Sequence, residues 1–415
     1  MHKVSEIEAF KKLFVNSLPD DDNRTVISTC DLIIGLAFCF LGDSKTFSIE
    51  AIRRYVIIQL QTTISKSAFW ERIAGNPLKN KMKNLISELM KNISTKALYG
   101  KNLLPLLSIK NIYLVDSSSI TLWDGAKKNF PGTRTHAGIK WHCCFDLFSG
   151  ALVWFKTSPT KMHDSLFFPK LTLFKNSLVI FDLGYWDYKL LQKIVEAHGF
   201  FLSRIKCSAN ISIDGIIQGL PKKYIGEKLL SLNFKKSMNV IELIGSILSD
   251  GTWQSYRVIG FWNKKEKKYH WYVTNLLVSS KIIYTLYRLR WQIELIFKGC
   301  KQSLNIDEKQ KSNNKNIIEI LILSSVIATL ATTIILAIGI NGVSEKKKRS
   351  ISFQKIYQVM ALVAHDFINY LSKKNEKYKK ILEKNIRLIS EELFIKNHEN
   401  RKTTLTKLFD ELVCE

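Results

Sequence analysis

Five short apolar runs between residues 108 and 206 constrain the fold most, because runs rich in β-branched and aromatic residues favour strands. The expected strands are residues 112–116, 138–146, 151–157, 178–182 and 200–205. A tight turn at 148–150 joins the second and third strands into a hairpin. Three strands in a meander, followed by strand, helix and strand, predict a mixed α/β sheet.

The helix expected between the last two strands has its own local signals. Asp187 is suited to cap its first turn, because a carboxylate there accepts hydrogen bonds from free amide groups. Four apolar residues at helical spacing form the expected inner face: Leu190, Leu191, Ile194 and Val195.

The regions around this block differ in pattern. Residues 207–280 are again strand-like and predict a β-rich insertion, in which TWQSYRVIGFW and YHWYVTN form a hairpin around the lysine-rich turn NKKEKK. Helices are expected at 284–305 and 317–340. The expected organisation is a helical N-terminal DNA-binding region, a sheet core split by the insertion, and a helical C-terminal region: 1–107, 108–206, 207–280, 281–345 and 346–415.

Within the N-terminal region, residues 48–75 predict two helices, with Ser65 capping the second. The pair resembles a helix-turn-helix, and a plain helical hairpin is an equal alternative. In a helix-turn-helix, three residues of the second helix would face DNA: Lys66, Ser67 and Arg72.

The chain is strongly basic, with 62 Lys and Arg residues against 36 Asp and Glu residues and a net charge of +26. Such a charge favours association with polyanions, and nucleic acid is the leading partner. The alternative is an ordinary enzyme from an AT-rich genome in which lysine is common.

The seven cysteines contain no Cys-x-x-Cys pair and have no companion histidines at zinc-ligand spacing. They are typical of reduced thiols in a cytoplasmic protein. The opening segment MHKVSEIEAF lacks the apolar stretch of a secretory signal. Three histidines fit no ligand spacing, and no role is predicted for them: His136, His142 and His163.

One segment challenges the prediction of a cytoplasmic protein, because residues 320–340 carry no charge and are long enough to cross a bilayer. Five hydroxyl residues interrupt the segment, and basic residues flank it on both sides. We favour a buried core helix and no membrane, and a membrane anchor is the alternative.

Two aspartates end apolar runs, Asp116 in IYLVDSSS and Asp182 in LVIFDLGYWD. If the two strands are neighbours, they lie about 5 Å apart and bring the carboxylates together. Close carboxylates need a shared proton or a cation, and their hard oxygens favour magnesium or manganese. The alternative is that each aspartate is a turn or helix cap.

The segment YRLRWQIELIFKGCK predicts a helix with one functional stripe. At about 100° per residue, four residues fall within a sector of about 60°: Tyr287, Arg290, Glu294 and Lys301. An adjoining apolar stripe lets the helix pack on a core while it presents Glu294 beside groups that can bind phosphate. The alternative is a solvated basic face on which Glu294 pairs with Arg290.

The spacing Tyr-x2-Arg-x3-Glu-x6-Lys of this stripe resembles the signature of bacterial insertion-sequence transposases of the family numbered four. Asp116, the DLGYWD context of Asp182, the FLSRIK strand at 201–206 and a β-rich insertion before Glu294 agree with it. The resemblance spans roughly residues 112–301.

This resemblance implies an RNase H-like core whose Asp116, Asp182 and Glu294 hold two Mg²⁺ or Mn²⁺ ions. Such a pair of cations activates the attacking oxygen and stabilises the leaving oxygen of a phosphoryl transfer. The implied substrates are the element's double-stranded DNA ends and the target DNA, cut and pasted through hairpin ends. The family also implies a homodimer assembled on DNA, in a cytoplasmic and nucleoid-associated protein.

The resemblance also implies DNA contacts. Tyr287, Arg290 and Lys301 would hold phosphates by a hydrogen bond, a fork and a point charge, respectively. An aromatic residue of the insertion would stack on a flipped base. Trp271 is the candidate, with Trp253 and Trp262 behind it, and a core position is the alternative.

Arg204 and Lys206 alternate with Ile205 along the FLSRIK strand, so both can face DNA from the sheet; a solvated strand face is equally plausible. At the level of the whole chain, the alternative to an active transposase is a catalytically inactive DNA-binding relic of one. Acids at all three positions argue against that alternative.

Overall fold

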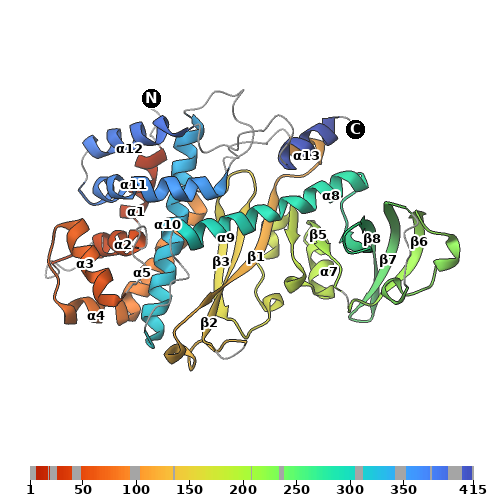
Figure 1. The fold of residues 1–415 in the computed structure, drawn as a ribbon, viewed down its shortest axis with the longest axis horizontal. Helices are drawn as coiled ribbons and strands as arrows, with labels where there is room; N and C mark the ends of the chain where they lie inside the picture. Colours follow the sequence, from red (N-terminus) through yellow and green to blue (C-terminus); the bar gives the residue numbers. More distant parts are fainter. Residues whose placement is uncertain are drawn as a thin grey trace.

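The computed structural model describes residues 6–16, 18, 26–39, 48–93, 103–133, 136–206, 208–232, 238–303, 312–341, 352–373, 376–390 and 404–413. A single nine-stranded sheet crosses the middle of the molecule, with a helical lobe at one end and a β-rich lobe at the other (Figure 1). The predicted mixed α/β fold class is confirmed.

The core of the sheet has the strand order β3-β2-β1-β4-β5. Its strands are β1 (Ile112–Thr121), β2 (Gly138–Asp146), β3 (Leu152–Pro159), β4 (Leu178–Phe181) and β5 (Phe200–Arg204). The meander β1-β2-β3 is antiparallel, and β4 and β5 run parallel to β1. An antiparallel meander extended by two parallel strands is an RNase H-like core.

The first strand is longer than predicted. It pairs with β2 as far as Thr121 opposite Gly138, whereas its parallel pairing with β4 ends at Val115 opposite Phe181. Polar residues 116–119 did not end the strand, because the long antiparallel partner continues to satisfy the backbone there. Asp116 therefore lies within its strand.

Helix α7 (Tyr188–Glu196) separates β4 and β5, as predicted. The Asp187 carboxylate accepts hydrogen bonds from the amides of Lys189 and Leu190, so the predicted cap is confirmed. Leu191 and Ile194 are buried, but Val195 faces solvent, against the prediction. Only a narrow stripe of the helix surface packs against the core, and Val195 lies beside that stripe.

The insertion continues the core sheet. Its strands are β6 (Ile211–Gln218), β7 (Val240–Ser249), β8 (Thr252–Asn263) and β9 (Lys268–Thr274). Strand β9 pairs with β5 of the core, and the remaining strands follow outward in antiparallel order. The predicted hairpin around the lysine-rich turn is confirmed as β8 and β9.

Arg257 ties the insertion to the chain that follows it. Its guanidinium donates to the Glu242 carboxylate at 2.6 Å, to the Leu276 carbonyl at 3.2 Å and to the Val278 carbonyl. Both side chains of the ion pair are nearly buried. Since residue 279 caps the next helix, α8 (Ser280–Leu289), this contact fixes where that helix begins.

Replacing Arg257 by methionine is expected to lower the free energy of unfolding by about 3–5 kcal/mol, because Glu242 is left buried without its cation. Urea unfolding measures the loss. Lys268→Met is the control, since Lys268 forms an exposed ion pair with Glu266. An unfolding curve for Arg257→Met that overlaps that of Lys268→Met would contradict this role.

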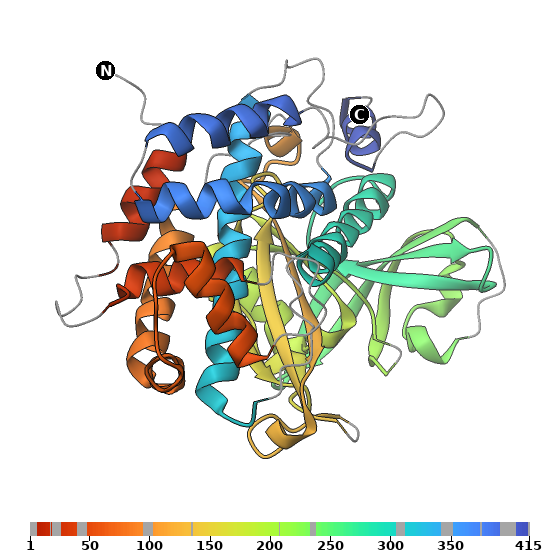
Figure 2. The ribbon, with the colours of Figure 1, turned by 60° about the vertical axis from the view of Figure 1, so that its left-hand side comes forward.

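The helical lobe gathers segments from both ends of the chain around α10 (Lys315–Asn341), as Figures 1 and 2 show. The surrounding helices are α1 (Glu6–Asn16), α2 (Thr29–Phe38), α3 (Ile49–Leu60), α4 (Lys66–Ala74), α5 (Asn76–Ile93), α11 (Phe353–Lys373) and α12 (Glu376–Leu388). The N-terminal and C-terminal helical regions thus share one core. Helix α13 (Thr404–Val413) lies beside α8 and contacts α6 (Leu103–Leu106).

Helix α10 contains the uncharged segment. Over Lys315–Ile334 it is long and apolar enough to span a membrane, and 94% of its most apolar window is buried inside the protein. Its hydroxyl residues bond back to carbonyls of their own helix, as Ser324 does to Ile320 and Thr329 to Ser325, both at 2.8 Å. This packing agrees with the predicted core helix.

The predicted helix pair at 48–75 is present as α3 and α4, and Ser65 caps α4 by accepting from the Ala68 amide. Lys66 and Ser67 are exposed. Arg72 is not available to DNA as predicted, because its guanidinium donates to the Ile27 carbonyl at 2.5 Å. This contact joins segments 45 residues apart, which local spacing cannot reveal.

Candidate active site

The sheet places Asp116 and Asp182 side by side. The last paired residues of the parallel strands are Val115 and Phe181, and each aspartate is the next residue of its chain. Neighbouring strands lie about 5 Å apart. The two carboxylates therefore occupy the point where β1 and β4 stop pairing.

The helix predicted at 284–305 is two helices within the described residues, α8 and α9 (Trp291–Ser303), joined at Arg290. The Arg290 amide bonds to the Tyr287 carbonyl at 3.1 Å, and the Ile293 amide bonds to the Arg290 carbonyl at 3.1 Å. These three-residue hydrogen bonds tighten the turn. Figure 1 shows the two helices running end to end across the sheet.

Arg290 bridges two of the acids. One guanidinium nitrogen donates to Asp116 Oδ2 at 2.8 Å, and another donates to Glu294 Oε1 at 2.6 Å. Tyr287 donates its hydroxyl to Asp182 Oδ1 at 3.3 Å. Residues from β1, the end of β4 and the α8–α9 helices thus meet in one cluster, although 178 positions separate Asp116 from Glu294 in the chain.

Lys301, the last member of the helical stripe, lies at the edge of this cluster. Its ammonium donates to the carbonyl of Ser119 on β1 at 2.8 Å. The contact holds α9 against the segment of β1 that extends beyond Asp116. The structure therefore brings all four residues of the stripe to the same side of β1.

The charges of the cluster do not balance, since Arg290 faces three carboxylates. Burial raises the pKa of Asp116 to about 6; Arg290 lowers it, and the nearby Asp182 and Glu294 raise it further. Burial also raises the pKa of the Tyr287 hydroxyl, and the Asp182 charge adds to that rise. A site with such uncompensated negative charge favours an added cation.

Carboxylate oxygens are the hard ligands that Mg²⁺ and Mn²⁺ prefer, so the donor set suits either ion. The side chains are not arranged as ligands: among the described residues, no three His, Cys, Asp or Glu side chains form a group that could hold a metal. The Arg290 guanidinium lies between Asp116 and Glu294 and bonds to both. The donor chemistry therefore suits such an ion, while the Arg290 guanidinium stands between two of the three donors.

Replacing Arg290 by glutamine is expected to lower the free energy of unfolding by about 3–5 kcal/mol in EDTA, because three acids lose their partly buried cation. Added Mn²⁺ should restore some of the loss by binding the freed carboxylates. Thermal unfolding with and without Mn²⁺ checks both effects. Arg288→Gln is the control, since Arg288 is an exposed arginine two residues before Arg290; equal behaviour of the two variants would contradict the expectation.

An aromatic groove of about 460 Å³ opens beside Arg290. Its lining includes the rings of Tyr272, Tyr284, Tyr287 and Trp291 and the guanidinium of Arg288. Trp291 and Tyr284 are exposed. The sequence analysis predicted Tyr287 but missed Tyr272, Tyr284 and Trp291, although Trp291 directly follows Arg290 in the helical signature and could have been found there.

Trp271 does not line this groove. It is 9% exposed and packs in the core of the insertion, where a Cβ atom on Gly260 would lie 2.6 Å from its ring. Trp262 packs against Tyr269 with ring centroids 5.0 Å apart. Trp253 is 58% exposed, at the turn between β7 and β8. For Trp271 the geometry agrees with the core alternative.

Arg204 ends β5, where it pairs with Tyr272 of β9, and its charge lowers the pKa of both Tyr272 and Tyr287. Burial, the larger effect, raises the pKa of Tyr272 to about 12. Lys206 is half-buried two residues later, and Ile205 between them is buried. Arg204 is therefore the one of the two basic residues that the structure brings to the cluster.

An RNase H-like sheet with two aspartates on neighbouring strands and a glutamate on the helix that crosses them is the arrangement of the DDE class of proteins. The profile of the family described as Transposase DDE domain matches residues 108–330, which is more than half of the chain. This chain belongs to that family. The predicted family is confirmed, whereas the subtype with the tyrosine, arginine, glutamate and lysine signature stays a prediction.

Two relatives have similar sequences. The transposase for insertion sequence element IS1151 of Clostridium perfringens is 25% identical over 404 residues, covering 79% of this chain and 84% of the relative. The transposase for IS231F of Bacillus thuringiensis subsp. israelensis is 25% identical over 274 residues, covering 54% of this chain and 56% of the relative. The chain thus spans little more than half of the latter protein.

A solved structure of a piggyBac transposase synaptic complex with hairpin DNA aligns with 97% of this chain and 87% of its own, with a TM-score of 0.49 and 10% identity.

Proposed function

We propose that the protein is a transposase that cuts the DNA ends of its own element and joins them to target DNA by metal-dependent phosphoryl transfer. The meeting of Asp116, Asp182 and Glu294 around Arg290 carries this proposal. The net charge of +26 supports a DNA substrate, since it favours association with a polyanion. The family and its named relatives support the same activity.

Asp116, Asp182 and Glu294 would hold the divalent cations, two Mg²⁺ or Mn²⁺ ions per site. When bound, two such ions activate the attacking oxygen and stabilise the leaving oxygen of an in-line displacement. The side chains themselves supply the ligands. Asp116 serves best above its pKa of about 6, where it is charged.

Arg290 has a second proposed role besides neutralising the acids. Its fork can pair with a phosphate group as well as with a carboxylate. DNA entering the site would draw Arg290 from Asp116 toward the backbone phosphate and would leave the carboxylates free for cations. Tyr287 and Lys301 would hold neighbouring phosphates by a hydrogen bond and a point charge.

A cut-and-paste reaction through hairpin ends needs room for a distorted strand beside the site. The groove lined by Tyr272, Tyr284 and Trp291 offers aromatic faces on which a displaced base can stack. This groove suits such a base better than Trp271, whose ring is buried. Arg204, close to the tyrosines of this groove, would add positive charge there, with Lys206 further along the strand.

Synapsis of two ends requires two active sites, so we propose a homodimer assembled on DNA, acting in the cytoplasm at the nucleoid. A catalytically inactive relic is the second candidate function. The acid cluster disfavours it, since a protein that only binds DNA has no use for three carboxylates close to one another on its DNA-binding side.

The test incubates the purified chain with Mg²⁺ and a duplex that carries the end of its own element. We expect nicks at the element boundary that leave a 3′-hydroxyl, followed by strand transfer into a target plasmid. Binding of the end without nicking, in Mg²⁺ and in Mn²⁺, would favour the inactive relic.

A further inference from the structure

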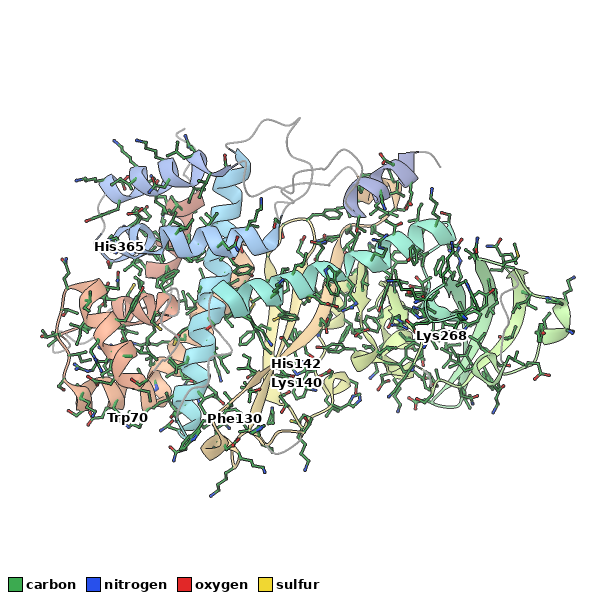
Figure 3. All side chains as sticks on the ribbon, in the orientation of Figure 1. Trp70, Phe130, Lys140, His142, Lys268 and His365 are labelled. Carbon is green, nitrogen blue, oxygen red and sulfur yellow. The ribbon has the colours of Figure 1, made fainter. Side chains whose placement is uncertain are left out.

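A fully buried histidine lies directly behind the two aspartates. His142 is 0% exposed and lies on β2 opposite Ser117 of β1, one residue beyond the pair formed by Asp116 and Cys143. Figure 3 labels it together with Lys140 of the same strand. Both nitrogens of the His142 ring are hydrogen-bonded, although its sequence context predicted no role for this side chain.

The hydrogen bonds of His142 have a defined direction. Ser158 donates its hydroxyl to the Pro159 carbonyl at 3.3 Å, so the Ser158 oxygen accepts from His142 Nε2 at 2.9 Å. His142 Nδ1 is then the acceptor for the Tyr185 hydroxyl, also at 2.9 Å. The imidazole also stacks on the Phe167 ring, with centroids 4.7 Å apart. This environment holds one neutral tautomer in one orientation.

Tyr185 connects this histidine to both aspartates. It belongs to the short turn that follows Asp182, and its amide donates to the Asp182 carbonyl at 3.1 Å. Its hydroxyl bonds to His142, which lies opposite Ser117, the neighbour of Asp116. Tyr185 and His142 together therefore connect the chain next to each of the two acids.

The turn that follows Asp182 packs tightly against the segment at Asp164. A Cβ atom on Gly184 would lie 2.7 Å from the carboxylate of Asp164, which is itself held by Lys140 at 2.6 Å. The backbone ladder between β1 and β4 ends at Val115 and Phe181, before the acids. Beyond that point, side-chain contacts must set how far apart the two carboxylates stand.

We propose that Tyr185 and His142 are positioning residues that fix the separation of Asp116 and Asp182 for cation binding. This inference rests on the proposed function. The rigid ring of Tyr185, anchored at its hydroxyl by His142, resists the repulsion that pushes the like charges away from each other in the absence of metal. Loss of that anchor leaves the carboxylates in place but lets their spacing vary.

The test variant is Tyr185→Phe, which removes only the hydroxyl. Mn²⁺ binding in the absence of DNA is followed by the electron paramagnetic resonance signal of free Mn²⁺. Loss of the hydrogen bond between the Tyr185 hydroxyl and His142, which supports the proposed ligands without touching the metal, is expected to weaken Mn²⁺ binding by about 10- to 100-fold. Binding of end DNA in EDTA, measured by gel shift, is expected to stay as in the wild type.

Tyr256→Phe is the matched control. Tyr256 is also buried, and its hydroxyl has no hydrogen-bond partner among the described residues. Its loss should leave Mn²⁺ affinity unchanged. A structural effect of removing a buried hydroxyl would appear in both variants, whereas the proposed role affects Tyr185→Phe alone.

A second variant, His142→Phe, keeps the ring on Phe167 and removes the acceptor for Tyr185. A protein that carries both Tyr185→Phe and His142→Phe should bind Mn²⁺ no more weakly than Tyr185→Phe alone, because both changes break the same hydrogen bond. Additive losses would overturn the proposal, as would a Tyr185→Phe protein whose Mn²⁺ affinity equals that of Tyr256→Phe.

Asp116→Asn separates this proposal from the proposed function. If the wild type binds Mn²⁺ and Asp116→Asn does not, the metal site exists, and the Tyr185 result decides the positioning role. If Asp116→Asn binds Mn²⁺ as the wild type does, the metal site itself is refuted, and the proposed positioning falls with it.

Discussion

Replacing Glu294 by glutamine is expected to lower the rate of end cleavage by about three orders of magnitude. The change keeps the size of the side chain and removes the charge that, in the proposed function, holds a cation over the scissile phosphate. Stabilisation by a bound metal is worth several kcal/mol, and each 1.36 kcal/mol is a factor of ten in rate. Single-turnover cleavage of a labelled end in Mg²⁺ measures the loss.

The matched control is Glu266→Gln, in the exposed turn between β8 and β9. It makes the same chemical change at an exposed position outside the acid cluster and should cleave as the wild type does. DNA binding by Glu294→Gln should be no weaker than that of the wild type, since a negative charge has been removed. Cleavage by Glu294→Gln within threefold of wild type would exclude Glu294 as a catalytic residue.

Replacing Asp116 by asparagine is expected to abolish cleavage and to make the protein more stable. Burial raises the pKa of Asp116 from 3.8 to about 6, so the folded state disfavours the charged form. The cost at neutral pH is about 3 kcal/mol, since each pH unit of pKa change is worth about 1.36 kcal/mol. Asparagine carries no charge and avoids this cost.

The sign of the pH dependence follows from the same pKa. The penalty is complete above pH 6, shrinks as the pH falls from 6 toward 3.8, and is absent below that range, where both folded and unfolded chains are protonated. Thermal unfolding in EDTA should therefore show a gain for Asp116→Asn that is largest at neutral pH and smaller at pH 5. EDTA is needed because a bound metal, as proposed, would stabilise the wild type.

Asp250→Asn is the control for this effect, because Asp250 is exposed and pairs with Lys189 at the surface. Its replacement should change the unfolding midpoint little at any pH. A less stable Asp116→Asn protein at neutral pH would show that Asp116 is held mainly by its ion pair with Arg290 and is not penalised by burial.

The sheet could be predicted because its strands carry local signals. Strand β2 has the predicted bounds, and Asp187 caps the first turn of α7 as predicted. The end of β1 could not be predicted, because residues 116–119 are polar and only the distant partner β2 keeps them in the sheet. Local pattern thus finds elements better than it finds their ends.

The candidate site was only partly predictable for a similar reason. Helical spacing alone puts Tyr287, Arg290 and Glu294 on one stripe, so their common direction follows from sequence. That Arg290 would bridge two acids from different elements depends on the tertiary fold. Trp271 is buried and Arg72 bonds to the Ile27 carbonyl, and strand and helix patterns do not reveal which side of an element is covered in this way.

His142 shows the limit most clearly. As a single histidine without metal-ligand spacing it carried no signal in the sequence, and only the pairing of β1 with β2 and the turn after Asp182 place it behind the acids. Such supporting residues have no fixed spacing from the groups they position, since they act through contacts between elements.

The claim on which all of this depends is that the acid cluster brings a divalent cation to the scissile phosphate. Sulfur substitution of a non-bridging oxygen at that phosphate tests it directly, because Mg²⁺ binds sulfur poorly and the softer Mn²⁺ tolerates it. We expect the wild type to cleave the sulfur-substituted end very slowly in Mg²⁺ and to regain most of its rate in Mn²⁺. An equal effect of sulfur in both ions would contradict the account.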